Sequence, residues 1–214
     1  MNLDVSTEPE TIIAEESLQE LGDRADRTLG PLLLIASIIA WAGSATLVWE
    51  RLQIYMDANH QSVCDLNALL NCGTVMRTDQ AAVFGFPNPF IGIVGFAIVA
   101  TIGAGLLAGG RFRPWFWWST QLGVTFAMGF ILWLWYNTTF IINALCLFCM
   151  LVWLMTVPIF IFVTARNLTN GLIPAPERVR RIAGAWSWFT TALIYLLLFG
   201  IIVIRFFEQI VNLF

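Results

Sequence analysis

The four cysteines of the chain form two pairs with different spacings. Cys64 and Cys72 are eight positions apart, and Cys146 and Cys149 form a C-x-x-C motif. C-x-x-C is the spacing of thiol–disulfide exchange sites. Two such pairs that meet in space can pass electrons, because a thiolate of one attacks the disulfide of the other through a mixed disulfide. The cysteine pattern therefore favours redox chemistry of thiols.

The C-x-x-C pair is predicted at the start of an apolar helix. Free backbone N–H groups and the helix dipole stabilise a thiolate at such an end. Cys146 is then the shallower thiol, and Cys149 lies about 4.5 Å deeper along the helix axis. Trp153, four residues after Cys149, continues the same helix face. We expect Cys146 to meet a loop cysteine and Cys149 to face a hydrophobic electron acceptor.

The other pair lies in the segment 50–89, which is the only sizeable segment outside the predicted spans besides the tail. Leu66, Leu69 and Leu70 favour one or two helical turns lying on the membrane. Polar neighbours are expected to keep Cys64 and Cys72 accessible. A disulfide between them could then be attacked by the thiolate of another protein.

Membrane helices must position these cysteines, because 58% of the residues are hydrophobic and 12% are charged. The mean hydropathy is +0.77, which is far outside the range of soluble domains. No basic stripe is present, so a nucleic-acid surface is not expected. Apolar stretches of about 18 residues or more predict transmembrane helices. Five such stretches predict an all-α polytopic membrane protein: about 32–49, 90–107, 115–136, 140–163 and 186–206.

The arginines predict the orientation of these spans. They are concentrated in the two segments that follow the second and fourth spans, at Arg111, Arg113, Arg166, Arg178, Arg180 and Arg181. The positive-inside rule therefore places the acidic amino-terminal tail in the cytoplasm and segment 50–89 outside. Both cysteine pairs then lie at the extracytoplasmic face, where disulfides form and persist.

Other interpretations of the cysteines remain open on residue patterns alone. A single C-x-x-C in an apolar helix can be structural, because cysteine also packs as a small apolar residue. Four cysteines could also bind zinc, although the typical zinc-finger spacing is missing. A membrane scaffold or transport subunit with structural disulfides would show the same count. An unrelated class of quinone reductase carries its C-x-x-C in the first outer loop, which reverses the order seen here.

The combined motif resembles the vitamin K epoxide reductase family, and its bacterial branch in particular. The resemblance covers about residues 32–163. It rests on a C-D-x6-C motif, a Thr six residues later, an Asn before the second span and the C-x-x-C of the fourth. The matching residues are Cys64, Asp65, Cys72, Thr78, Asn88, Cys146 and Cys149.

The resemblance implies a four-helix bundle around a quinone pocket, with a fifth transmembrane helix outside the bundle. The implied divisions are an acidic tail (1–29), a catalytic bundle (30–165), a cytoplasmic loop (166–184) and the fifth helix with a short tail (185–214). It also implies a bacterial inner membrane as the location. No metal is expected.

The resemblance also implies a role for each matching residue. Electrons would pass from a thiol partner to Cys64, and then through Cys72 and Cys146 to Cys149, which would reduce the quinone. Asn88 and Trp153 would hydrogen-bond the quinone oxygen, and Thr78 would support exchange near the cysteines. Vertebrate members have Tyr where this chain has Trp153, and an indole N–H can donate a hydrogen bond but cannot act as an acid.

The activity implied is that of a membrane thiol:quinone oxidoreductase, which uses menaquinone or ubiquinone. It would reoxidise a DsbA-like thioredoxin-fold protein and so sustain disulfide formation in exported proteins. Many bacterial relatives carry a fused thioredoxin-like domain after the fifth span. Because this chain stops at Phe214, the resemblance implies that the partner is a separate protein.

Overall fold

The computed structural model describes residues 8–57 and 59–211, and most of these residues are helical. The long helices are α1 (Glu8–Met56), α3 (Pro89–Leu107), α4 (Pro114–Tyr136), α5 (Leu147–Thr169) and α7 (Ser187–Arg205). The short ones are α2 (Cys72–Met76), the 3₁₀ turn η1 (Asp79–Ala82), the π-helical η2 (Asn137–Ile142), α6 (Glu177–Ala185) and α8 (Phe207–Val211).

Five of the described helices are long and apolar enough to cross a membrane, which confirms the polytopic all-α prediction. Two predicted boundaries were wrong. The fourth span begins at Leu147 rather than near 140, because η2 prolongs α4 and Asn143 then turns the chain with a left-handed backbone (φ 57°). The first span belongs to a helix that continues through Pro31. Burial of Leu29 and Leu33 on either side of Pro31 helps to offset the backbone hydrogen bond that proline lacks.

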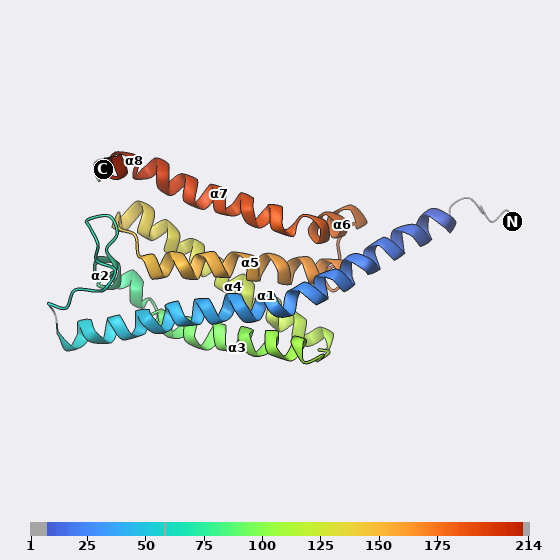
Figure 1. Ribbon diagram of the computed structural model, residues 1–214, viewed down its shortest axis with the longest axis horizontal. Coiled ribbons are helices and arrows are strands. Elements are labelled where there is room, and N and C mark those ends of the chain that lie inside the picture. Colours follow the sequence, from blue (N-terminus) through green and yellow to red (C-terminus); the bar gives the residue numbers. More distant parts are fainter. Residues whose placement is uncertain (1–7, 58, 212–214) are drawn as a thin grey trace.

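Helices α1, α3, α4 and α5 form a four-helix bundle (Figure 1). α1 packs along α3 and α5, and α4 packs along α5. The crossing of α1 and α3 is tight at Gly103, where a Cβ atom would lie 2.6 Å from the Leu34 backbone nitrogen. α7 packs against the outside of α5, so the prediction of a fifth helix outside the bundle is confirmed.

The end of α5 away from the cysteines is fixed by polar contacts. The buried Asn167 side chain donates to Gln121 Oε1 at 2.9 Å, and Gln121 donates to Thr164 Oγ1 at 3.0 Å. Arg166 pairs with Asp26 of α1 at 2.8 Å and lies over the Trp117 ring. These contacts hold the helix that carries the C-x-x-C motif in a fixed position within the bundle.

Segment 59–88 lies at the other end of the bundle and includes α2 (Figure 1). The prediction of helical turns at Leu66, Leu69 and Leu70 was wrong. These residues form bends and one bridge, and the helix begins at Cys72 instead. Asn71 caps α2 by accepting a hydrogen bond from the Thr74 backbone N–H at 2.6 Å, a role that asparagine fills well.

Candidate active site

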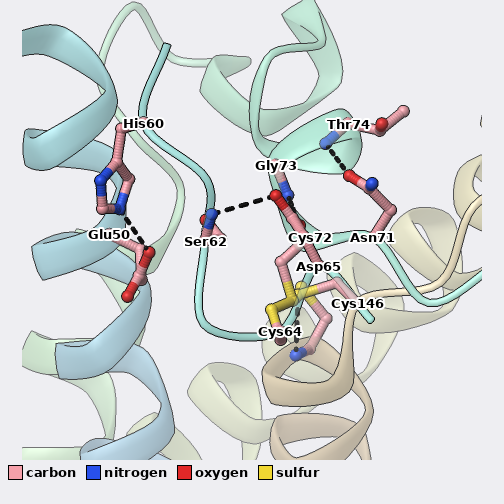
Figure 2. Close-up of a disulfide and its surroundings, with 11 residues drawn as sticks. Glu50, His60, Ser62, Cys64, Asp65, Asn71, Cys72, Gly73, Thr74 and Cys146 are labelled. Atoms are coloured by element: carbon pink, nitrogen blue, oxygen red, sulfur yellow. Dashed lines mark hydrogen bonds and ion pairs between the residues drawn. A yellow bond between two sulfur atoms is a disulfide. The ribbon is translucent and has the colours of Figure 1, made fainter. Parts of the chain in front are cut away.

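Three of the cysteine sulfurs gather at the capped end of the bundle. Cys64 and Cys72 form a disulfide, with Cα atoms 5.7 Å apart. The sulfur atoms of Cys64, Cys72 and Cys146 all lie within 4.8 Å of one another. Figure 2 shows them converging from the loop, from the start of α2 and from the residue before α5. This distance suits an exchange of disulfides between the two pairs with little movement.

A small backbone bridge sets the alignment of the two pairs. Leu70 and Leu145 form an isolated parallel β-bridge. The Asn71 N–H donates to the Leu145 carbonyl at 2.9 Å, and the Leu145 N–H donates to the Leu69 carbonyl at 2.7 Å. Cys146 directly follows Leu145, and Cys72 directly follows Asn71, whose N–H makes one of these two bonds. The bridge therefore places the two cysteines side by side, although they are 74 positions apart in the sequence.

Asp65 closes the loop around the disulfide. Its Oδ1 accepts the Gly73 N–H at 2.8 Å, and its Oδ2 accepts the Ser62 N–H at 3.0 Å (Figure 2). Gly73 leaves room for this carboxylate, because a Cβ atom there would lie 2.7 Å from Oδ2. Asp65, which follows Cys64, thus bonds to Gly73, which follows Cys72, and this bond keeps the two halves of the disulfide loop together.

The expectation that the loop cysteines are accessible was wrong. Cys64 is 4% exposed and Cys72 is fully buried. They belong to an apolar cluster with Leu47, Val75 and Cys146. Polar neighbours do not prevent this burial, because their side chains bond to the loop's own backbone and so leave the sulfurs to pack inward. The disulfide is therefore shielded from solvent by its own loop and by the end of the bundle.

Cys146 occupies the capping position of α5. The Cys149 backbone N–H points at the Cys146 sulfur, at 3.4 Å. A hydrogen bond from the Cys149 thiol lowers the pKa of Cys146 below its ordinary value. The backbone N–H groups of Cys149 and Phe148 add to this, while burial opposes it. The lowered pKa favours the thiolate, as the helix-end position predicts.

Cys149 faces a cavity of about 460 Å³ inside the bundle. Its walls come from α1, α3, α4, η2 and α5 and from segment 75–88 before α3, whereas no described residue of α7 lines it. Most of the lining is apolar. Thr78, Asn88, Cys149 and Trp153 all line it, so the structure brings together these four residues of the predicted site. Cys146 instead lies against the disulfide, so Cys149 is the one cysteine among the described residues that line the cavity.

Asn88, Thr78 and Trp153, which were predicted to act near the quinone, differ in whether their hydrogen-bond donors are already used within the chain. Asn88 donates to the Gln80 carbonyl at 2.7 Å and accepts from the Val83 N–H at 3.2 Å, so it braces the loop before α3. The Thr78 hydroxyl donates to the Val75 carbonyl at 2.8 Å. Trp153 is 2% exposed, and its indole N–H has no hydrogen bond within the described chain. Trp153 therefore lines the cavity with a donor to spare.

The cavity reaches the outer surface of the bundle between α3 and α4. Ile98 of α3 and Phe126 of α4 both line the cavity, yet they are 57% and 54% exposed. Neither helix packs extensively on the other, because α3 lies mainly on α1 and α4 on α5. In a bilayer this side would face lipid, so an apolar molecule could extend from the cavity into the hydrocarbon region.

Sequence reasoning missed some residues around the site. Arg51 lines the cavity although it sits at the end of a predicted span, where arginine is common. Arg205 of α7 donates to Asn143 Oδ1 at 2.8 Å, just before Cys146. Phe206 is buried against Leu69 and Leu145. No local signal in the sequence identifies these contacts, because they join distant segments.

Residues 31–164 of the chain match the family described as the vitamin K epoxide reductase family. The match includes the bundle, the loop over its end and all four cysteines. No individual curated protein matches the chain.

Proposed function

The chain belongs to the vitamin K epoxide reductase family of quinone-linked thiol oxidoreductases, and from this premise we propose that it reoxidises a DsbA-like thioredoxin-fold partner at the expense of a membrane quinone. One observation carries the proposal. The Cys64–Cys72 disulfide lies against Cys146, and the C-x-x-C partner of Cys146 lines a largely apolar cavity. A continuous route for two electrons then runs from the loop to the cavity.

Each step on this route exchanges one disulfide for another. A partner thiolate attacks Cys64, Cys72 leaves as a thiolate, and the second partner thiolate completes the partner's disulfide. Cys72 then attacks Cys146 in an oxidised Cys146–Cys149 pair, and Cys64 resolves the mixed disulfide. This leaves Cys64–Cys72 oxidised and Cys146 and Cys149 reduced, which is the combination of redox states in this structure.

The cavity residues suit a quinone. A bound quinone supplies the acceptor for two electrons, and menaquinone and ubiquinone both have the required flat ring. The spare indole N–H of Trp153 would donate to a ring oxygen, and the second amide hydrogen of Asn88 would do the same. Thr78, held by the Val75 carbonyl, would keep the loop between α2 and the cavity in place. The side between α3 and α4 would admit the apolar tail.

The proposal includes the orientation of the protein. The arginines after α3 and around α6 would lie in the cytoplasm, and the cysteine-bearing end would face the extracytoplasmic side of a bacterial inner membrane. A disulfide-forming enzyme needs its thiols on that oxidising side. Labelling of single cysteines, placed at position 61 or 108 in a cysteine-free chain, with a membrane-impermeant maleimide tests this, because both positions are exposed. We expect labelling at 61 but not at 108 in intact cells, and the opposite result would contradict the proposed orientation.

Turnover in reconstituted protein tests the function. Purified wild-type protein is mixed with a reduced DsbA-like partner and a soluble quinone, and quinone reduction is followed by absorbance. We expect turnover by wild type and none by Cys149→Ala. A Cys72→Ala variant should trap a mixed disulfide between Cys64 and the partner. A Cys64→Ala variant lacks this sulfur and should not form that complex. A structural scaffold would show neither turnover nor a trapped complex.

A further inference from the structure

Arg51 brings a positive charge to the wall of the cavity. It lies near the carboxyl end of α1, on the same wall region as Ser44 and Leu47. Among the described residues that line the cavity, Arg51 is the only one with a formal charge. A cation beside an apolar space interacts more strongly with a ligand than it would in water, because the surroundings screen it less.

No carboxylate neutralises Arg51 within the described chain. The neighbouring acid, Glu50, is buried and bonds to His60 at 3.1 Å instead (Figure 2). The Nε atom of Arg51 is buried and has no hydrogen-bond partner among the described residues. The guanidinium lies over the face of the Tyr55 ring, with Cζ 4.8 Å from the ring centroid. Buried donors are normally bonded, so this one calls for a ligand.

Most other polar side chains that line the cavity already donate hydrogen bonds within the chain. Each serine and threonine hydroxyl that lines it donates to a backbone carbonyl. These hydroxyls belong to Ser44, Thr78, Ser119, Thr120, Thr138 and Thr156. Asn88 and Asn137 each use one amide hydrogen in the same way. Arg51, Trp153 and the Gln80 side chain are therefore the lining donors that bond to no other described residue, and of these only Arg51 carries a charge.

We propose that the Arg51 guanidinium binds a ring oxygen of the quinone-type acceptor and stabilises the negative charge that develops there as electrons arrive from Cys149. The proposal rests on the proposed function and adds a charge-stabilising residue to it. Cys146 and Cys149 lose two electrons and form their disulfide, and the acceptor gains these electrons. The two protons of the thiols balance the reduced oxygens.

The chemistry favours this role over a purely anchoring one. A preorganised donor aimed at an oxygen that becomes negative lowers the barrier, because it bonds the charged product of electron transfer more strongly than the neutral reactant. Trp153 can donate only one neutral hydrogen bond. A guanidinium can donate several bonds and adds full charge. The alternative is that Arg51 extends to a lipid phosphate at the membrane surface, as arginines near helix ends often do.

Steady-state kinetics of Arg51→Gln test the proposal. We expect kcat/KM for the quinone to fall roughly 100-fold, as on loss of one oxyanion donor. The rate at which reduced partner exchanges with the Cys64–Cys72 disulfide, measured without quinone, should stay within twofold of wild type. Arg77→Gln is the matched control, because Arg77 is exposed and its guanidinium donates to the His60 carbonyl at 3.2 Å, outside the cavity. It should leave both rates unchanged.

A second variant and a change of surroundings complete the test. Arg51→Lys keeps the charge but loses the planar fork, so we expect it to recover part of the lost kcat/KM. If Arg51→Gln does not fold, Arg51→Lys replaces it in the test, and we expect its kcat/KM for the quinone to be at least tenfold below that of wild type. The same losses should occur in an uncharged detergent. A defect seen only in phospholipid vesicles would assign Arg51 to lipid instead.

Two results separate this proposal from the proposed function. If wild type does not reduce quinone with a reduced partner, the proposed function fails. If wild type turns over and folded Arg51→Gln has a kcat/KM for quinone within twofold of it, the assignment of Arg51 is overturned while the proposed function stands.

Discussion

The Asn71 backbone N–H donates to the Leu145 carbonyl at 2.9 Å, and this one bond joins the chain just before Cys72 to the chain just before Cys146. The return bond from the Leu145 N–H to the Leu69 carbonyl makes the contact a β-bridge. A bridge of this kind fixes register, because a shift by one residue would turn the side chains to the opposite face. The alignment of the two redox pairs is thus a property of the backbone.

The first prediction concerns the pH at which Cys146 reacts. The Cys149 thiol is the largest cause that lowers the pKa of Cys146, so Cys149→Ala should raise that pKa. Asp65 acts in the opposite sense, since its negative charge raises the pKa of Cys146, and Asp65→Asn should lower it. Thiolate is the reactive form, so the alkylation rate rises with pH and levels off above the pKa.

The measurement uses protein in which Cys64 and Cys72 are replaced by Ala, so that the loop thiols do not react. Iodoacetamide modification of Cys146 is followed against pH by mass spectrometry. The midpoint should move to higher pH in Cys149→Ala and to lower pH in Asp65→Asn. Cys149→Ser, whose hydroxyl still donates, should move less than Cys149→Ala. Equal midpoints in all variants would contradict the assigned cause.

The second prediction concerns Asp65 and Gly73 as a pair. Gly73→Ala places a Cβ atom 2.7 Å from Asp65 Oδ2, so the carboxylate must move and its bonds to the loop weaken. We expect a cost of about 1–3 kcal/mol in the free energy of unfolding, as for other overpacked sites. In an Asp65→Ala background the obstacle is gone. Gly73→Ala should then cost less than half as much.

A double-mutant cycle followed by thermal or denaturant unfolding in detergent measures this coupling. Thr74→Ala serves as the control, because the Thr74 side chain is exposed and its backbone N–H still bonds to Asn71. Strictly additive effects of the Asp65 and Gly73 substitutions would show that the close approach does not constrain the loop.

The sequence predicted the parts of the site that depend on local pattern. Apolar stretches predicted the number of spans. The C-x-x-C pair at the start of a helix predicted a favoured thiolate, and the pKa of Cys146 is lowered, although the Cys149 thiol is the largest cause and the backbone N–H groups add to it. The resemblance to the family implied that Cys149, Asn88 and Trp153 share one pocket, and the structure places all three at one cavity. Only the spans and the helix-end cysteines follow from residue pattern within one segment, whereas the meeting of Asn88 with Cys149 and Trp153 came from the family motif.

Other features depend on contacts between distant segments and were missed. Leu66, Leu69 and Leu70 have a helix-like spacing, but pairing with Leu145 holds this stretch in a bridge. The polar residues around Cys64 suggested exposure, yet their side chains bond to the loop itself and the sulfur packs against the bundle. Tertiary contacts override local propensity in both cases, and the sequence of the loop alone does not predict these contacts.

The third prediction concerns the packing of α1 on α3. Gly103→Ala puts a Cβ atom 2.6 Å from the Leu34 nitrogen and 3.0 Å from the Gly30 carbonyl oxygen, so two backbones must separate. Small residues allow such close approach of membrane helices. We expect a loss of about 1–3 kcal/mol in stability, from overpacking. Gly129→Ala is the control, because a Cβ atom there meets nothing within 4 Å.

Thermal unfolding in a single detergent compares these two variants with wild type. Gly103→Ala should unfold at a clearly lower temperature, while Gly129→Ala should unfold at or slightly above the wild-type temperature, since alanine favours helix over glycine. Equal melting of both variants would mean that α1 and α3 tolerate a wider separation than their crossing indicates.

The last prediction concerns the contact between the fifth helix and the segment that presents Cys146. Arg205 donates to Asn143 Oδ1 at 2.8 Å, and Asn143 holds a left-handed backbone with φ 57°. Asn143→Gly keeps this conformation available but removes the acceptor, so it should behave like Arg205→Gln. Asn143→Ala removes the acceptor and also opposes the conformation, which adds about 1–2 kcal/mol. Its effect should therefore be the largest of the three.

The readout is the rate at which Cys72 and Cys146 cross-link under mild oxidation when Cys64 and Cys149 are both Ala. This rate reports the alignment of the two sulfurs directly, whereas overall stability is followed separately by melting. We expect Arg205→Gln and Asn143→Gly to slow cross-linking by a similar factor, and Asn143→Ala to slow it further. If Arg205→Gln melts earlier but cross-links at the wild-type rate, the fifth helix stabilises the fold without positioning Cys146.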